Sequence, residues 1–154
     1  MNLSQWLDTL TDGKFPGDLA YRGKREAISA DLRPFPEKLH PELCNVLREK
    51  GISKLYSHQT RAIGHYLAGE DFIVTTPTAS GKTLSYLLPV LNDKLMHPAG
   101  RHLFLFPTKA LAQDQLANFR DFKGRLKQNW SVSTFDGDTP VEERRNVKQG
   151  GDLI

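Results

Sequence analysis

Apolar residues in the middle of the chain recur at the spacing of amphipathic helices. Four of them fall at positions i, i+4, i+7 and i+8 of one stripe: Leu39, Leu43, Val46 and Leu47. Gly51 stands directly after this stripe, where a helix C-cap belongs. The pattern therefore predicts a helix over about residues 37–50.

A second helical pattern follows at once. Ser57 precedes it and Gly69 ends it, and these residue types are favoured at helix N-caps and just after helix ends. Its apolar residues share one face: Ala62, Ile63, Tyr66 and Leu67. We expect a helix between Ser57 and Gly69.

The first 35 residues show little periodicity. They combine several glycines and prolines with mixed charges, a composition typical of irregular backbone. Only the stretch SQWLDTL at 4–10 has the pattern of a short helix. We therefore predict an N-terminal extension over residues 1–35, partly irregular and partly helical, followed by a compact domain over residues 36–154.

Beyond Gly69 the pattern alternates between short apolar runs and amphipathic stretches. Three runs have the length and composition of strands: DFIVTT at 71–76, HLFLF at 102–106 and SVSTF at 131–135. Helices are predicted between them, one over about 80–92 and one after Thr108. Such alternation is typical of an α/β fold whose parallel sheet is covered by helices on both faces. Pro89 lies inside the first of these helices, so we expect a bend or an early end there.

Composition places the chain among ordinary globular proteins. Of its 154 residues, 38% are hydrophobic and 25% are charged, so a packed core is expected. No apolar run approaches the roughly 20 residues that span a bilayer, and the N-terminus lacks the pattern of a secretory signal. The single cysteine, Cys44, cannot form an internal disulfide. These features predict a cytoplasmic protein without a membrane association.

The charge of the chain decides little about its partners. A formal net charge of +3 is compatible with a polyanionic ligand but does not require one. The segment 120–127 holds four basic residues against one acid, and we interpret it as a solvated helix end.

The stretch TTPTASGKT at 75–83 carries the most specific chemistry. It joins a predicted strand to a predicted helix and ends with Gly-Lys-Thr, the second half of the phosphate-loop pattern, whereas a threonine replaces the pattern's first glycine. We expect the whole loop to bind the phosphates of ATP: Thr76, Pro77, Thr78, Ala79, Ser80, Gly81, Lys82 and Thr83.

Within this loop the residues have separate expected roles. Backbone amides from Ala79 onward would converge on the phosphates at a helix N-terminus, where partial positive charge favours an anion. Gly81 would let the backbone approach closely, Lys82 would neutralise the β- and γ-phosphate oxygens, and the Thr83 hydroxyl would ligate Mg²⁺. A strand-to-helix turn with an incidental lysine is the alternative interpretation.

Two other motifs point to ligands. Gln59 lies at the start of a predicted helix in YSHQ, and a glutamine amide can match the N6/N7 edge of adenine with one donor and one acceptor. In FPTKALAQDQ a strand ends and a helix begins at Pro107, Thr108 and Lys109, a place that suits a backbone phosphate of a nucleic-acid strand. Alone, either motif could be an ordinary helix start.

Other polar residues give weaker signals. Asp136 and Asp138 have no third carboxylate at a ligating spacing, and His58 and His65 have no cysteine or carboxylate cluster nearby, so neither pair predicts a metal site. The turn before the last predicted helix matches a capping box with proline at the first helical position: Thr139, Pro140 and Glu142.

Together, three stretches resemble the opening motifs of superfamily 2 helicases of DEAD/DEAH-box type. LYSHQTRAI resembles the adenine-reading glutamine motif, TPTASGKT the first ATPase motif, and FPTKALAQDQ the motif that grips the nucleic-acid backbone, in the family's order. GISKLYSHQ and FDGDTP are similar to the branch of DNA-repair helicases that includes the mitomycin-repair enzymes. The resemblance covers residues from about 36 to 154 and implies an incomplete RecA-like domain.

The resemblance also implies an activity. It implies an ATP-dependent helicase that uses ATP and Mg²⁺ and contacts single-stranded nucleic acid, with DNA favoured over RNA and the choice between them left open. In the family the chain continues beyond GGDLI at 150–154 into an Asp-Glu motif needed for hydrolysis, and further strands lie beside 71–76. We therefore expect part of a longer helicase that binds ATP without a complete set of catalytic residues and leaves the edges of 71–76 unpaired.

Two alternatives stay open at this point. One is another phosphate-loop enzyme, such as a small-molecule kinase. The other is a non-catalytic module that binds nucleic acid or a protein partner.

Overall fold

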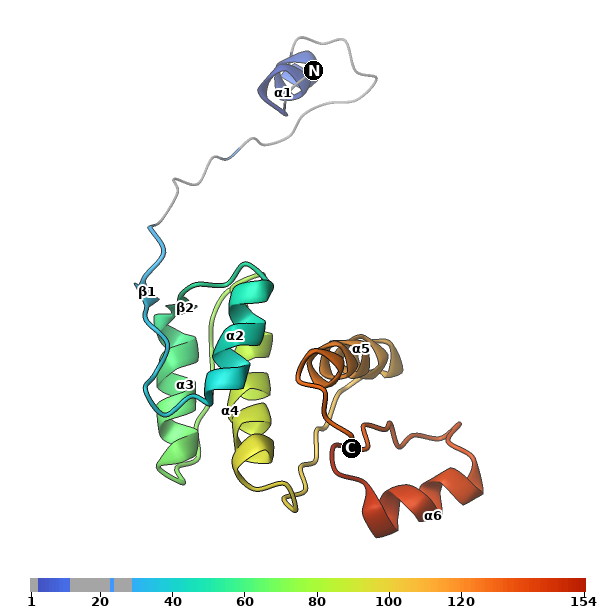
Figure 1. Ribbon diagram of the computed structural model, residues 1–154. Coiled ribbons are helices and arrows are strands. Elements are labelled where there is room, and N and C mark those ends of the chain that lie inside the picture. Colours follow the sequence, from blue (N-terminus) through green and yellow to red (C-terminus); the bar gives the residue numbers. More distant parts are fainter. Residues whose placement is uncertain (1–2, 12–22, 24–28) are drawn as a thin grey trace. The chain divides into compact units, whose positions relative to one another are not determined.

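The computed structural model of the chain describes residues 3–11, 23 and 29–154. The chain divides into two compact units, residues 1–30 and 31–154. In the first unit, α1 spans Leu3–Thr11 (Figure 1), which confirms the short helix predicted near the N-terminus. Most of the irregular stretch predicted after it lies outside the described residues.

The second unit begins with a short antiparallel pair of strands. β1 (Leu32–Arg33) pairs with β2 (Leu55–Tyr56), with Leu32 opposite Tyr56. The backbone N–H of Ser57 also donates to the carbonyl of Asp31 at 2.9 Å. Residues 31–35, which the sequence placed with the extension, are therefore attached to the second unit.

Helix α2 is shorter than the sequence predicted. It spans Pro41–Glu49, because Leu39 closes a turn back onto Pro36 (2.9 Å) and His40 acts as the N-cap. Its end agrees with the prediction. Gly51 adopts φ 78°, and the N–H groups of residues 51 and 52 bond back to the carbonyls of 48 and 47, the pattern of a Schellman motif.

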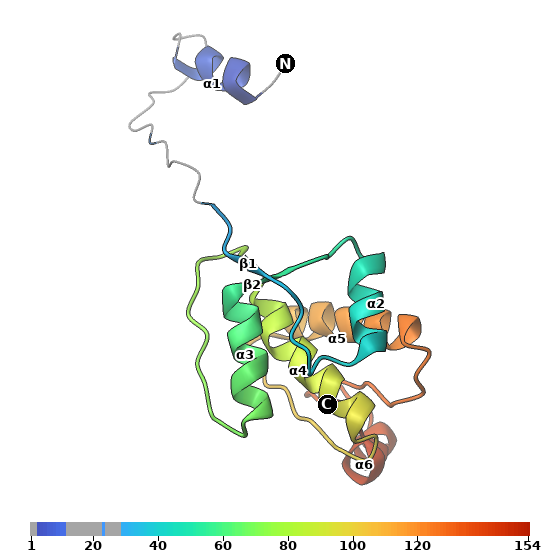
Figure 2. The ribbon, with the colours of Figure 1, turned by 60° about the vertical axis from the view of Figure 1, so that its left-hand side comes forward.

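Helices α3 and α4 form the centre of the second unit. α3 spans Ser57–Leu67 and ends at Gly69, which has φ 71°. α4 spans Lys82–Met96 and lies beside α3 in both views (Figures 1 and 2). α4 continues for seven residues beyond Pro89, so the predicted early end is wrong.

Two further helices follow. α5 spans Lys109–Arg125, with the predicted Thr108 as its N-cap, and α6 spans Val141–Gly150. The capping box predicted at the start of α6 is wrong, because the N-cap is Pro140 and no side chain caps the helix. The Thr139 hydroxyl instead accepts a hydrogen bond from the backbone N–H of Asp136 at 2.9 Å.

The predicted parallel sheet is present only in part. Segments 102–106 and 131–135 both lie parallel to 152–154 and are joined to it through two isolated bridges, His102 to Leu153 and Val132 to Leu153. Backbone hydrogen bonds of 2.7–3.1 Å hold the three segments together. Because these ladders are so short, the structure does not show a parallel sheet covered by helices on both faces.

Segment 71–76 does not form a strand. Within the described part of the chain, its backbone forms no hydrogen bond with another backbone segment, and the side chain of Ile73 is 90% exposed. A strand needs a hydrogen-bonded neighbour to satisfy its N–H and C=O groups. Among the described residues the neighbour of this segment is helix α3, whose His65 ring stacks on Phe72, and a helix cannot extend a sheet.

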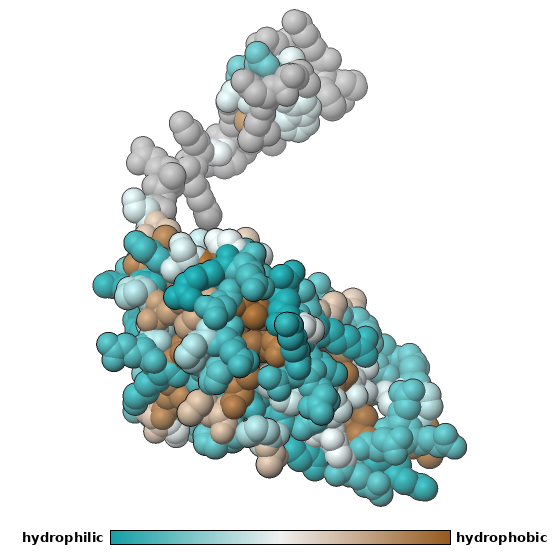
Figure 3. All heavy atoms as spheres, in the orientation of Figure 1, coloured by the Kyte–Doolittle hydropathy of each residue, from teal (hydrophilic) through white to brown (hydrophobic). Residues whose placement is uncertain are grey.

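The core of the second unit is apolar and continuous. It takes side chains from α2, α3, α4 and α5, among them Leu43, Leu47, Ile63, Leu87, Leu88, Leu91 and Phe119. The ring of Phe104 packs on that of Phe119 with centroids 4.7 Å apart and so attaches segment 102–106 to α5. Figure 3 shows a mainly hydrophilic face with apolar atoms gathered between polar side chains.

A buried lysine ties α4 to the parallel segments. The side chain of Lys94 is fully buried, and its ammonium donates to the carbonyl of Pro98, to that of Gly100 (2.7 Å) and to the carboxylate of Asp152 (2.6 Å). Asp152 in turn accepts from the N–H of Ser131 at 2.8 Å. A buried charge is tolerated only when it is paired and hydrogen-bonded in this way.

Candidate functional site

The loop of residues 76–83 joins segment 71–76 to the N-terminus of α4. Gly81 is the N-cap and adopts the left-handed conformation (φ 77°, ψ 27°), and no side chain caps the helix. A Cβ at Gly81 would lie 2.7 Å from Nε2 of Gln59, so a larger residue here would displace that side chain and would also be strained in the left-handed conformation. Because the first turn of a helix has N–H groups without intrahelical partners, this uncapped end is open to an anion.

The ammonium of Lys82 is folded back onto its own loop. It donates to the backbone carbonyls of Thr76 (2.6 Å) and Pro77 (2.7 Å). The hydroxyl of Thr76, at the position where the phosphate-loop pattern has glycine, lies 2.6 Å from that of Ser80. Both contacts close the loop with neutral groups, and no carboxylate of the described residues 3–11, 23 and 29–154 is paired with this lysine.

Gln59 connects the loop to α3. Its side-chain Nε2 donates to the carbonyl of Gly81 at 2.8 Å, and its Oε1 accepts from the N–H of Tyr56 at 2.9 Å. The residue is only 2% exposed. Each end of the amide has one hydrogen-bonding position left, so the expected contact with adenine stays a prediction.

Thr83 lies in the first turn of α4, close to Tyr86. Burial raises the pKa of the Tyr86 hydroxyl, while a hydrogen bond with Thr83 lowers it in part. The Tyr86 hydroxyl also donates to Gln115 of α5 at 2.8 Å. This chain of side chains links the start of α4 to α5, at whose N-terminus the second predicted site lies.

The second predicted site is the turn from segment 102–106 into α5. Pro107, Thr108 and Lys109 are all exposed. The Thr108 hydroxyl accepts from the N–H of Leu111 at 3.3 Å and so caps α5. The ammonium of Lys109 forms an ion pair with Asp138, whose carboxylate raises the pKa of this lysine.

Sequence reasoning missed the part that Asp138 plays here. The loop carrying it is held by Arg144, which donates to the carbonyls of Asp136 (3.0 Å), Gly137 (2.9 Å) and Thr139 (2.8 Å). The N–H of Asp138 donates to the carboxylate of Asp136 at 2.9 Å. The two acids of FDGDTP were the available signal, but only the fold shows that one of them faces Lys109.

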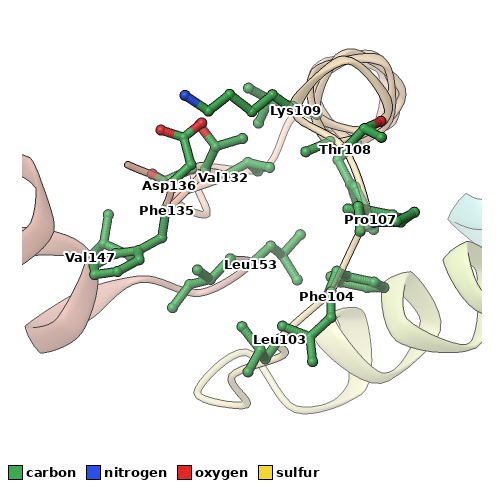
Figure 4. A pocket seen from close by; sticks show the side chains of 18 of the residues that line it. Leu103, Phe104, Pro107, Thr108, Lys109, Val132, Phe135, Asp136, Val147 and Leu153 are labelled. Carbon is green, nitrogen blue, oxygen red and sulfur yellow. The ribbon is translucent and has the colours of Figure 1, made fainter. Parts of the chain in front are cut away.

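An apolar hollow lies beside this second site (Figure 4). Its volume is about 510 Å³, and its lining includes residues 103–109, 132–136 and 153–154 together with side chains of α5 and α6. Figure 4 shows Leu103 and Leu153 at one side of the hollow, with Lys109 and Asp136 at the opposite rim. The polar side chains of this region thus gather where the parallel segments end.

The same described residues offer neither a metal cluster nor a membrane helix. In residues 3–11, 23 and 29–154, no three His, Cys, Asp or Glu side chains are grouped so that they could hold a metal ion. No helix in these ranges is both long and apolar enough to cross a bilayer.

Comparisons with known proteins give the family. Residues 56–154 match the DEAD/DEAH box helicase family. Among curated proteins, the ATP-dependent helicase YprA of Bacillus subtilis (strain 168) is 40% identical over 129 residues, which cover 84% of this chain and 17% of YprA. The ATP-dependent helicase hrq1 of Schizosaccharomyces pombe (strain 972 / ATCC 24843) is 39% identical over 131 residues, 83% of this chain and 12% of hrq1.

A solved structure agrees with these relatives. The DUF1998 helicase MrfA bound to DNA and AMPPNP matches with a TM-score of 0.86 and 36% identity over 96% of this chain and 21% of MrfA. The chain thus spans about a fifth or less of the length of these proteins. The match to MrfA supports the narrower resemblance to DNA-repair helicases. Since the family match covers well over half of its residues, the chain belongs to the DEAD/DEAH box helicase family.

Proposed function

We propose that this chain supplies the ATP-binding loop and one nucleic-acid contact of an ATP-dependent DNA-repair helicase. The observation that carries the proposal is the uncapped N-terminus of α4, with a left-handed Gly81 before it and with the Lys82 ammonium bonded to neutral carbonyl groups of the same loop. An anion at this position would find free N–H groups, the positive end of a helix dipole and a lysine.

In the proposed complex, ATP and Mg²⁺ occupy this loop. The N–H groups of residues 79–83 hold the phosphates, and Lys82 exchanges its two carbonyl partners for β- and γ-phosphate oxygens. Thr83 fits a Mg²⁺ ligand, because its hydroxyl lies in the first helical turn beside the phosphate position. Gln59, held against Gly81, binds the adenine edge with its two remaining hydrogen-bonding positions.

The second part of the proposal concerns the nucleic acid. Pro107, Thr108 and Lys109 bind a backbone phosphate of a single strand, through the N-terminus of α5 and the lysine ammonium. DNA is favoured over RNA because the similar helicase MrfA was solved bound to DNA. A reducing, cytoplasmic location is consistent with the single, buried Cys44.

The proposal is tested by titrating the protein with Mg-ATP in a calorimeter. Lys82→Ala removes the ammonium and should weaken binding by about 100-fold, since losing one partner of a charged, hydrogen-bonded pair costs several kcal/mol. Binding of a labelled single-stranded oligonucleotide to the same variant should stay close to that of the wild type.

Other results would favour the alternatives. ATP binding without any oligonucleotide binding, at low salt, would indicate another phosphate-loop enzyme. Oligonucleotide binding without any response to Mg-ATP would indicate a non-catalytic module, and the proposed role of residues 76–83 would then be wrong.

A further inference from the structure

The structure points to a second role for the loop of residues 135–140. We propose that Asp138 is an internal competitor of the nucleic-acid phosphate, because its carboxylate occupies the ammonium of Lys109 until a strand displaces it. The inference rests on the proposed nucleic-acid contact at residues 107–109 and adds to it the residue that controls access to that contact.

The competitor is held in place by the fold. Asp138 lies 29 residues beyond Lys109, in a loop whose three carbonyl groups are bound by the guanidinium of Arg144. The same guanidinium stacks over Phe135 at 5.6 Å, and the N–H of Asp138 is bonded to Asp136. The carboxylate therefore faces the lysine without further ordering of the loop.

A phosphate can replace Asp138 at Lys109 because this ion pair is open to water. The side chains of Lys109 and Asp138 are 56% and 83% exposed, so a phosphate can approach the lysine without opening the core. Exposed ion pairs are weak and are screened by salt. A phosphodiester strand can displace the carboxylate, since it gains further contacts at the N-terminus of α5 that a carboxylate side chain does not make.

This arrangement implies a selectivity for strands over small anions. A single free phosphate must compete with Asp138 for Lys109 and makes few further contacts that would stabilise its binding. A nucleic-acid backbone offers several phosphates and replaces the lost pair with more than one contact. Asp138 thus lowers the affinity for every anion at Lys109, and only a polyanion recovers the loss elsewhere.

The test uses the 154-residue chain and a fluorescein-labelled oligothymidylate, with binding followed by fluorescence anisotropy at low salt. Asp138→Asn keeps the size of the side chain and removes its charge, so it should tighten binding by about twofold to fivefold, the range expected for an exposed ion pair. Glu37→Gln, a change of the same charge at another exposed position, should give a smaller gain. In a Lys109→Ala background, Asp138→Asn should gain no more than Glu37→Gln does.

The possible failures can be told apart. If Asp138→Asn binds no more tightly than the wild type, if its gain persists without Lys109, or if Glu37→Gln matches it, Asp138 is no competitor. If Lys109→Ala alone binds like the wild type, the proposed nucleic-acid contact is itself wrong. Circular dichroism of each variant checks that the fold is unchanged.

Discussion

The two lysines that begin α4 and α5 occupy similar places, but one is bonded to neutral groups and the other to a charged group. Lys82 and Lys109 each stand at the first position of a helix. Lys82 is held by two neutral carbonyl groups, whereas Lys109 is held by a carboxylate. In the proposed complexes, a phosphate would therefore meet a lysine bonded to neutral groups at Lys82 and would have to replace a carboxylate at Lys109.

The helix ends in front of these lysines differ in the same sense. Gly81 leaves the N-terminus of α4 without a side-chain cap, whereas the Thr108 hydroxyl caps α5. The loop before α4 is bonded to α3 through Gln59. The turn before α5 follows segment 102–106, which belongs to the parallel segments that Asp152 joins to Lys94 and Ser131. The start of α4 thus has no side-chain cap among the described residues, whereas the start of α5 is capped by a side chain of the protein.

The largest expected effect is on the ion pair of Lys94 and Asp152, which holds together the segments that precede α5. Asp152→Ala leaves the buried ammonium of Lys94 without its charge partner, and breaking a buried ion pair typically costs about 3–5 kcal/mol of unfolding free energy. Urea denaturation followed by circular dichroism measures this loss. Asp121→Ala, which breaks the partly exposed pairs with Lys50 and Arg125, is the control and should cost about 1 kcal/mol or less. Equal losses for the two variants would contradict the account.

The same carboxylate should give the chain an acid sensitivity. Burial raises the pKa of Asp152, but hydrogen bonds from Lys94 and Ser131 outweigh it and leave the pKa lowered. A lowered pKa means that Asp152 stabilises the fold above its unfolded value of about 4, and that this stabilisation is lost as the pH falls through the lower folded value. Unfolding free energy measured from pH 6 to pH 2.5 should therefore fall less steeply for Asp152→Ala than for the wild type.

The next largest effect is expected at Gln59, which holds the loop before α4 against α3. Gln59→Ala removes both hydrogen bonds of a buried amide and leaves the N–H of Tyr56 and the carbonyl of Gly81 unpaired, which should cost about 2 kcal/mol. Mg-ATP affinity should fall as well. Gln113→Ala changes an exposed glutamine of α5 and should alter neither the stability nor the ATP affinity. A loss of ATP affinity in Gln113→Ala would contradict a specific role for Gln59.

A third test separates the effect of backbone strain from the effect of a steric contact with Gln59. Gly81→Ala forces an alanine into φ 77° and drives its Cβ against Gln59, so both stability and ATP binding should fall, the former by about 1–2 kcal/mol. Gly69 has a similar φ of 71° with open space around its Cβ position. Gly69→Ala should therefore lose a similar amount of stability but keep the ATP affinity. If Gly69→Ala also loses ATP binding, the contact with Gln59 is not what matters.

The smallest effect is expected at the cap of α5. Thr108→Ala removes the hydroxyl that accepts from Leu111, and the loss of such a cap typically costs about 1 kcal/mol. Thr78→Ala in the loop before α4, where no side chain caps the helix, should cost less. Thermal melts of the two variants measure the difference, and a larger loss for Thr78→Ala would reverse the comparison.

The helices could be predicted from the sequence because their signals are local. Gly51 and Gly69 end α2 and α3 as expected, since each adopts the left-handed conformation that glycine favours. The start of α2 was missed because Pro36 and Leu39 form a turn that resembles helical spacing. The strands were overestimated, because strand formation depends on neighbours distant in the sequence.

The motifs were found, but not the partners of their side chains. Gln59 and Gly81 are 22 residues apart, and Lys94 and Asp152 are 58 residues apart. No local pattern joins such pairs. The sequence thus predicted which residues bind ligands, and the fold was needed to show which contacts hold those residues.

The most direct test of the account is a titration of the ¹⁵N-labelled chain with Mg-ATP, followed by NMR. The account predicts saturable shifts at the amides of Gly81, Lys82 and Thr83, with the amide of Lys109 nearly unchanged. A folded protein whose amides at 81–83 stay unmoved at millimolar Mg-ATP would contradict it.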